Sequence, residues 1–454
     1  MGPNSRNVRY YYWLLVEFVK KHLKLIFLSA LISSIFIISS ITISPYLVNL
    51  LTPQNTVIGL VGSYTFDTLP DEILLKISNG LLFINEKGKP IPILAESWEI
   101  VEKGLVYRFH LKKNILMDDG TFFTARDINY RFRDVTTRLK GDYLIEFVLN
   151  KPLAIFPFYL TKPIVKYPHQ GIGGLYKIDR YKYRYDKLIE LSISPNKKDL
   201  SRISYKFYPS EAQMINAYKL GQITQMTLSK KSIADVFLQW KNSKVEKVVD
   251  YSNLLTLFFN YNNQFLKEKE VRGAIKIGID RGQFADLGAT ARTSVPPSSW
   301  AYQKNSKLPV YDAELGQKII RKFREATDSA KLNFNTYYDY LDIAGDINKN
   351  LNELGIPTNL NVMSYSNSND FDILLTYLKI APDPDQYYYW HSTQSLSQAT
   401  GYRNLKVDKI LEDGRSTFDQ EERIKFYYDL QKNLDDDNTA VFIYFPYTYT
   451  IKRI

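Results

Sequence analysis

Residues 381–394, "APDPDQYYYWHSTQ", bring two carboxylates, two prolines, three consecutive tyrosines, a tryptophan and a histidine into one short segment. Asp383, Asp385 and His391 are residue types that bind metal ions or act in acid–base catalysis. The aromatic residues are instead typical of a binding pocket, because their rings give broad contact at a low cost in conformational entropy. A metal or catalytic site, a pocket lining and a simple turn are therefore the three interpretations that the rest of the chain has to separate.

The inventory of metal ligands argues against a metal site. The chain has no cysteine and only four histidines (His22, His110, His169 and His391), which lie far apart and form no two-histidine zinc motif. The absence of cysteine excludes disulfides, thiolate metal sites, a cysteine nucleophile and a lipid-modified cysteine anchor. We therefore expect no metal and no cofactor.

Enzyme motifs are equally scarce. The glycine cluster "GIGGLY" (171–176) lacks the third glycine of a dinucleotide fingerprint and the Gly-Lys-Ser/Thr of a phosphate loop, and no G-x-S-x-G elbow occurs. Glycoside hydrolysis needs only two acids from anywhere in the chain, so an envelope hydrolase using Asp383 or Asp385 stays open as an alternative. Our expectation is that the protein is not an enzyme.

The N-terminus has the pattern of a membrane anchor. Five basic residues and one acidic residue lie within residues 1–24, whereas residues 25–66 carry no charge. An uncharged helix of about 20 residues is long enough to cross a bilayer. The positive-inside rule then predicts a cytoplasmic segment (1–24), a transmembrane helix (25–48) and an extracellular or periplasmic remainder. The rest of the net charge of +11 is spread thinly, which does not favour nucleic-acid binding.

Two alternatives for this region remain open. A cleaved signal peptide is the first, although the apolar stretch is long for one and no small-x-small cleavage site follows it. The second concerns residues 8–22, which have the pattern of an amphipathic, aromatic-rich helix that lies on the inner leaflet or simply extends the membrane helix.

Beyond the anchor, strand and helix patterns alternate over about four hundred residues. Alternation of apolar and polar residues predicts a half-buried strand at 105–111 with His110 on its polar face. Thr124 and Asp127 have the spacing of a capping box, which predicts a helix that carries Ile128 and Phe132. Later helices are expected around 343–354, ending at Gly355, and from Asp419 through Leu434. Such alternation predicts an α/β protein with its ligand between lobes or at strand ends.

Several segments together resemble family 5 of the extracellular solute-binding proteins, the oligopeptide- and dipeptide-binding proteins of ABC transporters. The segments are "PIPILAESWEIVEKGLVYRFHLKKNILMDDGTFFTARDINYRF" (90–132), "GIGGLYKI", "AYKLGQITQM", "VRGAIKIGIDRGQF", "DPDQYYYWHSTQ", "GYRNLKVDKILEDGRSTFDQEERIKFYYDLQKNL" and "FIYFPYTYTI". They follow one another in the family's order from about residue 56 to residue 454. "GIGGLYKI" lacks the family's proline, and Gln222 and Thr224 replace its acids.

The resemblance implies a two-lobed, periplasmic-binding-protein-like α/β fold of the large peptide-binding type (class II), with a ligand cleft between the lobes. Lobe 1 is expected to span 56–252 and to be completed by 435–454, and lobe 2 to span 253–434. The implied partners are a peptide ligand, a membrane permease and its cytoplasmic ATPases. Other ligands, namely an oligosaccharide, a metal chelate or haem, remain alternatives on the same fold.

The resemblance also implies the ligand contacts. In peptide-binding members an Asp in the segment that matches 381–386 pairs with the α-ammonium of the ligand. Asp383 is the best match and Asp385 the next. The other expected pocket residues are aromatic: Tyr377, Tyr387, Trp390 and Trp300. About half of the rings in the "YYYW" run are expected to be core residues, because burial is their default.

Overall fold

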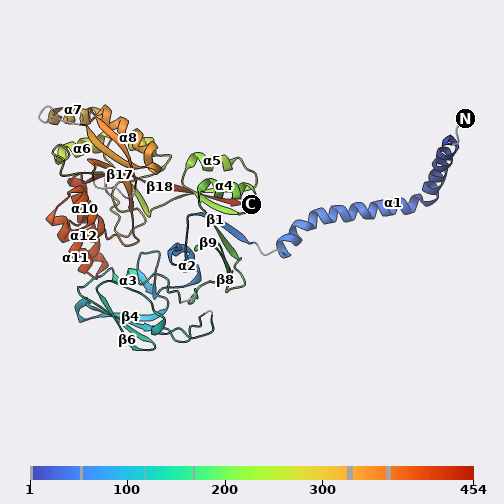
Figure 1. The fold of residues 1–454 in the computed structure, drawn as a ribbon, viewed down its shortest axis with the longest axis horizontal. Coiled ribbons are helices and arrows are strands. Elements are labelled where there is room, and N and C mark those ends of the chain that lie inside the picture. The colour runs from blue at the N-terminus through green and yellow to red at the C-terminus, as the bar shows by residue number, and fades with distance from the viewer. Residues whose placement is uncertain (1–3, 52–54, 118, 167–168, 325–330, 365–369) are drawn as a thin grey trace.

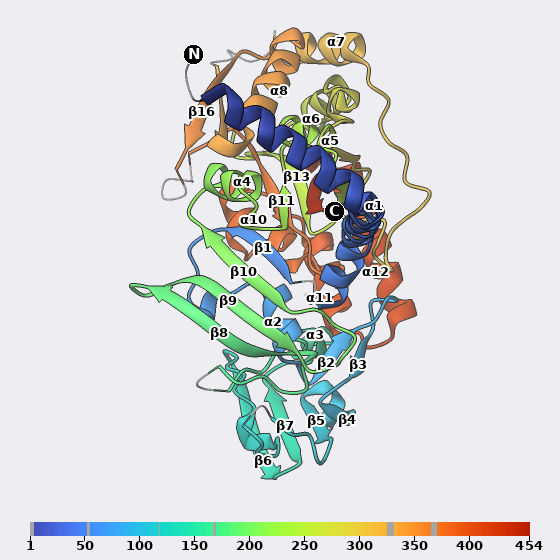
Figure 2. The ribbon, with the colours of Figure 1, turned by 90° about the vertical axis from the view of Figure 1, so that its right-hand side faces the viewer.

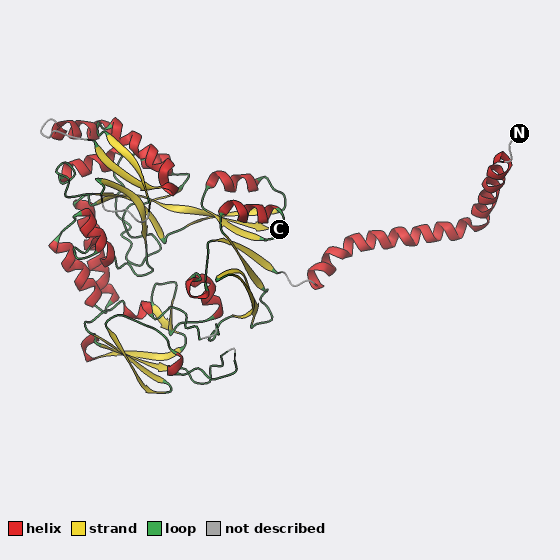
Figure 3. Ribbon diagram, viewed as in Figure 1, coloured by secondary structure: helices red, strands yellow, loops and turns green. Residues whose placement is uncertain are grey.

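The computed structural model describes all residues except 1–3, 52–54, 118, 167–168, 325–330 and 365–369, and describes no side chains for 4–8 and 40–51. An isolated helix, α1 (Asn4–Leu51), projects away from a folded body that comprises the rest of the chain (Figure 1). The body combines helices and strands throughout (Figure 3), as the alternating sequence pattern predicts.

The largest element of the body is one twelve-stranded sheet. Ten of its strands lie in the order β16 (Thr358–Met363), β15 (Leu332–Tyr337), β17 (Ile373–Lys379), β13 (Asn253–Phe259), β18 (Ala440–Arg453), β11 (Gln225–Leu228), β1 (Thr56–Val61), β10 (Ile203–Tyr208), β9 (Lys187–Pro195) and β8 (Tyr176–Arg184). Two further strands, β12 (Ser243–Val249) and β14 (Gly288–Thr290), also pair with β18.

Strand β18 joins two halves of this sheet. Its residues 440–444 pair with β13, whereas residues 447–453 pair with β12 and 449–452 with β11. The segment 435–454, expected to complete lobe 1, therefore pairs at its start with β13 and further along with β11 and β12, and the lobe bounds stay a prediction. The chain also crosses between the halves between β12 and β13, where the Asp250 N–H donates to the Pro446 carbonyl at 2.8 Å.

The half around β13 has three layers. Alternate residues of β13 point to opposite faces, so that Leu255 and Leu257 join one core and Leu254 and Phe258 the other. The first core is covered by α6 (Lys269–Gly278), α7 (Ala313–Arg324) and α8 (Leu341–Glu353). The second is covered by α9 (Tyr387–Trp390) and by three helices labelled in Figure 1, α10 (Ser395–Thr400), α11 (Leu405–Ser416) and α12 (Gln420–Asp436).

The other half carries α2 (Asp71–Ile77) on one face and α4 (Glu211–Lys219) with α5 (Lys231–Leu238) on the other. A separate unit lies at the end of the molecule in Figure 2. It contains a four-stranded sheet in the order β4 (Ala95–Val101), β5 (Val106–Leu111), β7 (Leu144–Leu149) and β6 (Val135–Gly141), with the hairpin β2 (Leu82–Ile84)–β3 (Pro90–Pro92) and α3 (Phe156–Tyr159).

Most of the predicted elements are present, but one is wrong. The expected strand at 105–111 is β5, with His110 exposed, and the expected helices are α8 and α12. The capping box of Thr124 and Asp127 does form, yet it opens only the 3₁₀ turn Ala125–Asp127 and not a helix. Ile128 has an extended conformation, no helix follows it, and residues 128, 130 and 132 are half-buried while 129, 131 and 133 are exposed.

Candidate functional site

The segment 381–394 follows β17 directly, at the end of that strand nearest the crossover between the halves. The Ile380 N–H donates to the Ser252 carbonyl at 2.8 Å, which fixes the start of the loop. Pro382 and Pro384 restrict the loop's φ angles. The Asp385 N–H donates to Asp383 Oδ1 at 3.0 Å, and the Tyr387 N–H donates to Asp385 Oδ1 at 3.2 Å. Both carboxylates therefore shape the turn that leads into α9.

Asp383 forms a buried, bidentate ion pair with Arg423 of α12. Arg423 Nη2 and Nη1 lie 2.7 and 2.9 Å from the two carboxylate oxygens, and the side chains are only 5% and 6% exposed. The remaining donors of Arg423 reach the Gly414 carbonyl and the Tyr427 hydroxyl. Burial raises the pKa of the Asp383 carboxyl, and the Arg423 guanidinium acts in the opposite direction. The Asp383 carboxylate thus accepts three hydrogen bonds within the protein, two from Arg423 and one from the Asp385 N–H.

Asp385 pairs with Arg415 of α11 through one of its carboxylate oxygens. Arg415 Nε and Nη2 lie 3.0 and 2.7 Å from Asp385 Oδ2. The guanidinium also lies over the Tyr387 ring, 3.8 Å from its centroid, and Tyr387 stacks on the other side against His391 at 4.1 Å. Charge neutralisation and ring stacking therefore hold the loop, α9 and α11 together.

This cluster borders the four-stranded unit. The Ala154 N–H, just before α3, donates to the Arg415 carbonyl at 2.6 Å, and the Tyr159 and Tyr388 hydroxyls lie 3.5 Å apart. Burial raises the pKa of the Tyr159 hydroxyl. Figures 1 and 2 both place α3 beside α11. The loop 381–386 consequently lies within the half around β13, but close to where the four-stranded unit meets it.

The remaining predicted pocket residues are spread over three environments. Trp390 is core, 2% exposed, and its Nε1 donates to Gln386 Oε1 at 2.8 Å. Tyr377 is half-buried on β17, with its ring 4.9 Å from that of Tyr340, and burial raises its pKa. Trp300 is half-buried with its ring 5.3 Å from the Arg423 guanidinium carbon. The structure thus brings Asp383, Asp385, Tyr387 and Trp300 around the two arginines and leaves Tyr377 apart, while a ligand contact by any of them stays a prediction.

The described residues around His391 are not arranged as a metal site. His391 is 4% exposed, with Nδ1 2.8 Å from Thr393 Oγ1 and Nε2 3.4 Å from Glu412 Oε1. Ser392 binds both carboxylate oxygens of Asp408. Within the described part of the chain, no three His, Asp or Glu side chains are grouped as metal ligands.

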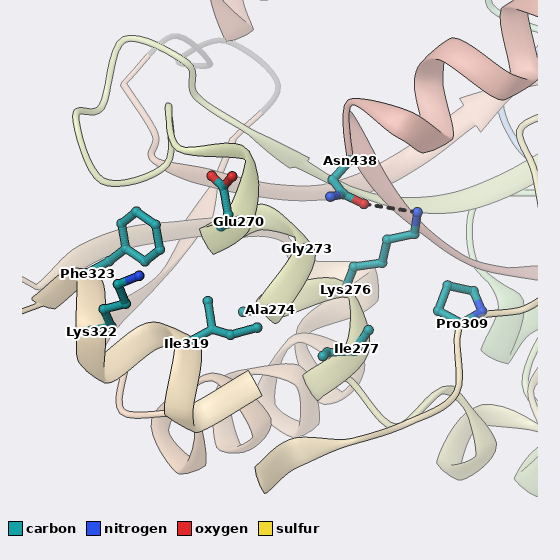
Figure 4. Close-up of a pocket in the computed structure, with 10 residues that line it drawn as sticks. All are labelled: Glu270, Gly273, Ala274, Lys276, Ile277, Pro309, Ile319, Lys322, Phe323 and Asn438. Carbon is teal, nitrogen blue, oxygen red and sulfur yellow. Dashed lines mark hydrogen bonds between the residues drawn. The ribbon is translucent and has the colours of Figure 1, made fainter. Parts of the chain in front are cut away.

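Two hollows of ligand size are lined entirely by residues of the half around β13. One, of about 570 Å³, lies between α6 and α7, with apolar walls from Ala274, Ile277 and Phe323; Lys276, hydrogen-bonded to Asn438, is at its edge (Figure 4). The other, of about 690 Å³, is lined by Trp300 together with Pro297, Ser299, Tyr302, Gln303, Lys304, Asn305 and Tyr428. Of the predicted pocket residues, Trp300 lines the second hollow.

Arg415 and Arg423 are the residues of this cluster that sequence reasoning missed. A signal for Arg423 was present, because Arg423, Tyr427, Leu430 and Leu434 share the buried face of α12. An arginine on an apolar helix face is almost never buried without a partner. Its partner lies 40 residues away in sequence, and only the fold shows which acid it is.

Comparison with known proteins identifies the relatives of this chain. Residues 89–398 match the model of the bacterial extracellular solute-binding proteins, family 5. The oligopeptide-binding protein AppA of Bacillus subtilis is 24% identical, over 86% of each chain. Its structure in complex with a nonapeptide superposes with a TM-score of 0.67 at 20% identity, covering 88% of this chain and 95% of AppA. NikZ of Campylobacter jejuni, solved with Ni(L-His), superposes with a TM-score of 0.71 at 19% identity, over 88% and 94% of the two chains.

Proposed function

Because this chain belongs to family 5 of the bacterial extracellular solute-binding proteins, we propose that it is a membrane-anchored receptor that captures peptides between its two lobes. It delivers them to the permease of an ABC importer, which cytoplasmic ATPases drive. The observation that carries the peptide assignment is the match to AppA over most of both chains. The relatives are named as binding proteins, which supports a receptor without catalytic turnover.

The anchor is the N-terminal helix. Within the part of the chain that the structure describes, one helix, Arg9–Ser39, is long and apolar enough to cross a membrane, and no part of it is buried in the protein. Basic residues before the span and none within 25–66 support an orientation with the binding lobes outside the cell. In this proposal the helix stays attached and replaces a lipid anchor.

The arginine pairs lead us to propose a positioning role for Asp383 and Asp385. A carboxylate that binds a ligand ammonium must be accessible to it, and both of these carboxylate side chains are only 5% exposed. Here each carboxylate already accepts two charge-assisted hydrogen bonds from an arginine. The two acids then hold the loop and its aromatic residues in place, and the peptide is held by its backbone and side chains without an ammonium clamp at this loop.

The test uses the detergent-solubilised full-length protein. Native mass spectrometry of the protein as purified identifies co-purified ligands, and calorimetry then compares each peptide with its N-acetylated form. We expect peptides to be bound and the two forms to differ by no more than a few-fold. A loss of a hundred-fold or more on acetylation would show that a carboxylate leaves its arginine to bind the ammonium.

A metal chelate is the second candidate, because NikZ with its Ni(L-His) shares the fold. In the same calorimetric experiment nickel–histidine replaces the peptide. Binding of the chelate but of no peptide would overturn the peptide proposal and leave the receptor assignment intact. Release of cleaved peptides during the experiment would overturn the receptor assignment itself.

A further inference from the structure

Helix α1 is not one straight element. At His22 the backbone leaves the helical region, with φ −111° and ψ 16°, and the helix bends there (Figure 1). The uncharged residues 25–44 that follow measure about 30 Å along a helix, which is the thickness of a bilayer's hydrocarbon core. The bend therefore lies at the inner edge of the proposed span, and residues 4–21 leave it in a different direction.

The segment before the bend is amphipathic. At about 100° per residue, its described charged residues Arg9, Glu17, Lys20 and Lys21 fall within an arc of roughly 120°. The opposite side consists of apolar and aromatic residues: Tyr11, Leu15, Phe18 and Val19. A membrane span that simply continued through this segment would be apolar all round.

Neither face of this segment is covered by the protein. The side chains of Tyr11, Leu15 and Phe18 are 66%, 63% and 57% exposed. Phe18 and His22 pack on each other at 4.9 Å along the apolar side. Tyr10 and Trp13 lie toward the charged side, where rings with a polar group suit the level of the lipid headgroups. The surface to be covered is thus apolar on one side and cationic on the other.

We propose that residues 4–21 form an in-plane helix on the cytoplasmic face of the membrane that recognises anionic lipid headgroups. The apolar side enters the boundary of the acyl chains, and Arg9, Lys20 and Lys21 meet the lipid phosphates. The bend at His22 supplies the change of direction from the membrane normal to the membrane plane. This inference rests on the proposed anchoring.

The absence of native cysteine makes a direct test possible. Leu15→Cys and Glu17→Cys lie about 3 Å apart along the helix axis but about 160° apart around it. Each full-length variant is spin-labelled in nanodiscs that contain phosphatidylglycerol. We expect the Leu15→Cys label to be more accessible to oxygen, which concentrates in the lipid. The Glu17→Cys label should be more accessible to a nickel chelate dissolved in water. Equal accessibility of the two labels, whether deep or fully aqueous, would overturn the in-plane helix.

Two further measurements separate the possible failures. A label at Ile35→Cys must be shielded from the aqueous reagent, because that position lies within the span; an exposed label there would contradict the anchor itself. If the Ile35→Cys label is shielded but the labels at positions 15 and 17 are equally accessible, the in-plane helix is contradicted and the membrane anchor is not. The triple variant Arg9→Gln/Lys20→Gln/Lys21→Gln should abolish the preference for phosphatidylglycerol over phosphatidylcholine. A preference that survives it would contradict recognition by charge.

Discussion

The side chains of Asp383 and Arg423 are almost inaccessible to solvent. Because water cannot solvate either charge, each charge is stabilised mainly by the other. Removing one partner of a buried pair leaves an uncompensated charge and costs about 3–5 kcal/mol. Asp383→Asn should therefore lower the free energy of unfolding by about that amount, measured by urea denaturation. The Trp300 ring, 5.3 Å from the Arg423 guanidinium carbon, gives a fluorescence signal for the same transition.

The chain offers a matched control on α11. Lys409 and Asp413 form an exposed pair four residues apart at 2.7 Å, so that Asp413→Asn removes the same charge where water replaces the partner. Its free energy of unfolding should stay almost unchanged. The double variant Asp383→Asn/Arg423→Gln should cost less than the sum of the single variants. Unchanged stability of Asp383→Asn together with lost peptide binding would instead support a direct ligand contact.

The sequence located this site but not its internal pairing. The composition of the run 381–394 set it apart from the rest of the chain, and in the structure it forms a turn and a short helix beside β17. The partners Arg415 and Arg423 lie 30 and 40 residues further along. Which acid meets which arginine depends on how α11 and α12 pack on the sheet, and this information is not local in sequence.

At the scale of elements, a local sequence pattern predicted the end of helix α8 correctly, because the tertiary structure favours the same conformation there. Gly355 was expected to end the helix at 343–354, and it does so at φ +84°. Its N–H donates to the Asn352 carbonyl, and that of Ile356 to the Leu351 carbonyl, which together form a Schellman motif.

The failure at residues 124–133 has a physical reason. Thr124 and Asp127 cap each other, but the Tyr130 hydroxyl bonds the carbonyls of Leu160 and Lys162, and its ring packs on Phe132 and Phe147. Those contacts need an extended chain. The alternation of apolar and polar residues in "INYRFR" already had the period of a strand. A two-residue capping box therefore does not make a helix where the longer pattern favours an extended chain.

Helix α8 allows a paired test of backbone conformation. A Cβ added at Gly345 or at Gly355 meets no atom within 4 Å, so neither substitution to alanine causes a clash. Gly345 lies inside the helix, where alanine is favoured over glycine by about 1 kcal/mol. Gly355 has a left-handed conformation, which costs a residue with a Cβ about 1–2 kcal/mol. Thermal unfolding should show Gly345→Ala raising the Tm and Gly355→Ala lowering it; the same sign for both would contradict the assigned backbone.

At the scale of the whole molecule, the two halves share a sheet and are joined by two adjacent crossings. One crossing is within β18 near Pro446, and the other lies between β12 and β13 near Asp250. The order of family-like segments predicted the two-lobed fold, because the segments are spread along the chain from the four-stranded unit to β18 and follow the family's order. It did not predict that β18 is divided between the halves, because one uninterrupted apolar strand gives no local sign of a change of partner.

The proposed anchor makes a prediction about the whole chain that its lack of cysteine renders easy to test. Val310 is 82% exposed on the folded body, whereas Arg9 lies on the other side of the proposed span. Since the basic residues precede the span, Val310→Cys should react with a membrane-impermeant maleimide in intact cells, and Arg9→Cys only after permeabilisation. Loss of the Arg9→Cys label from a shortened mature chain would show that the helix is a cleaved signal peptide. Labelling of Arg9→Cys from outside would show the opposite orientation, which would place the binding lobes where an importer's receptor has no ligand to collect.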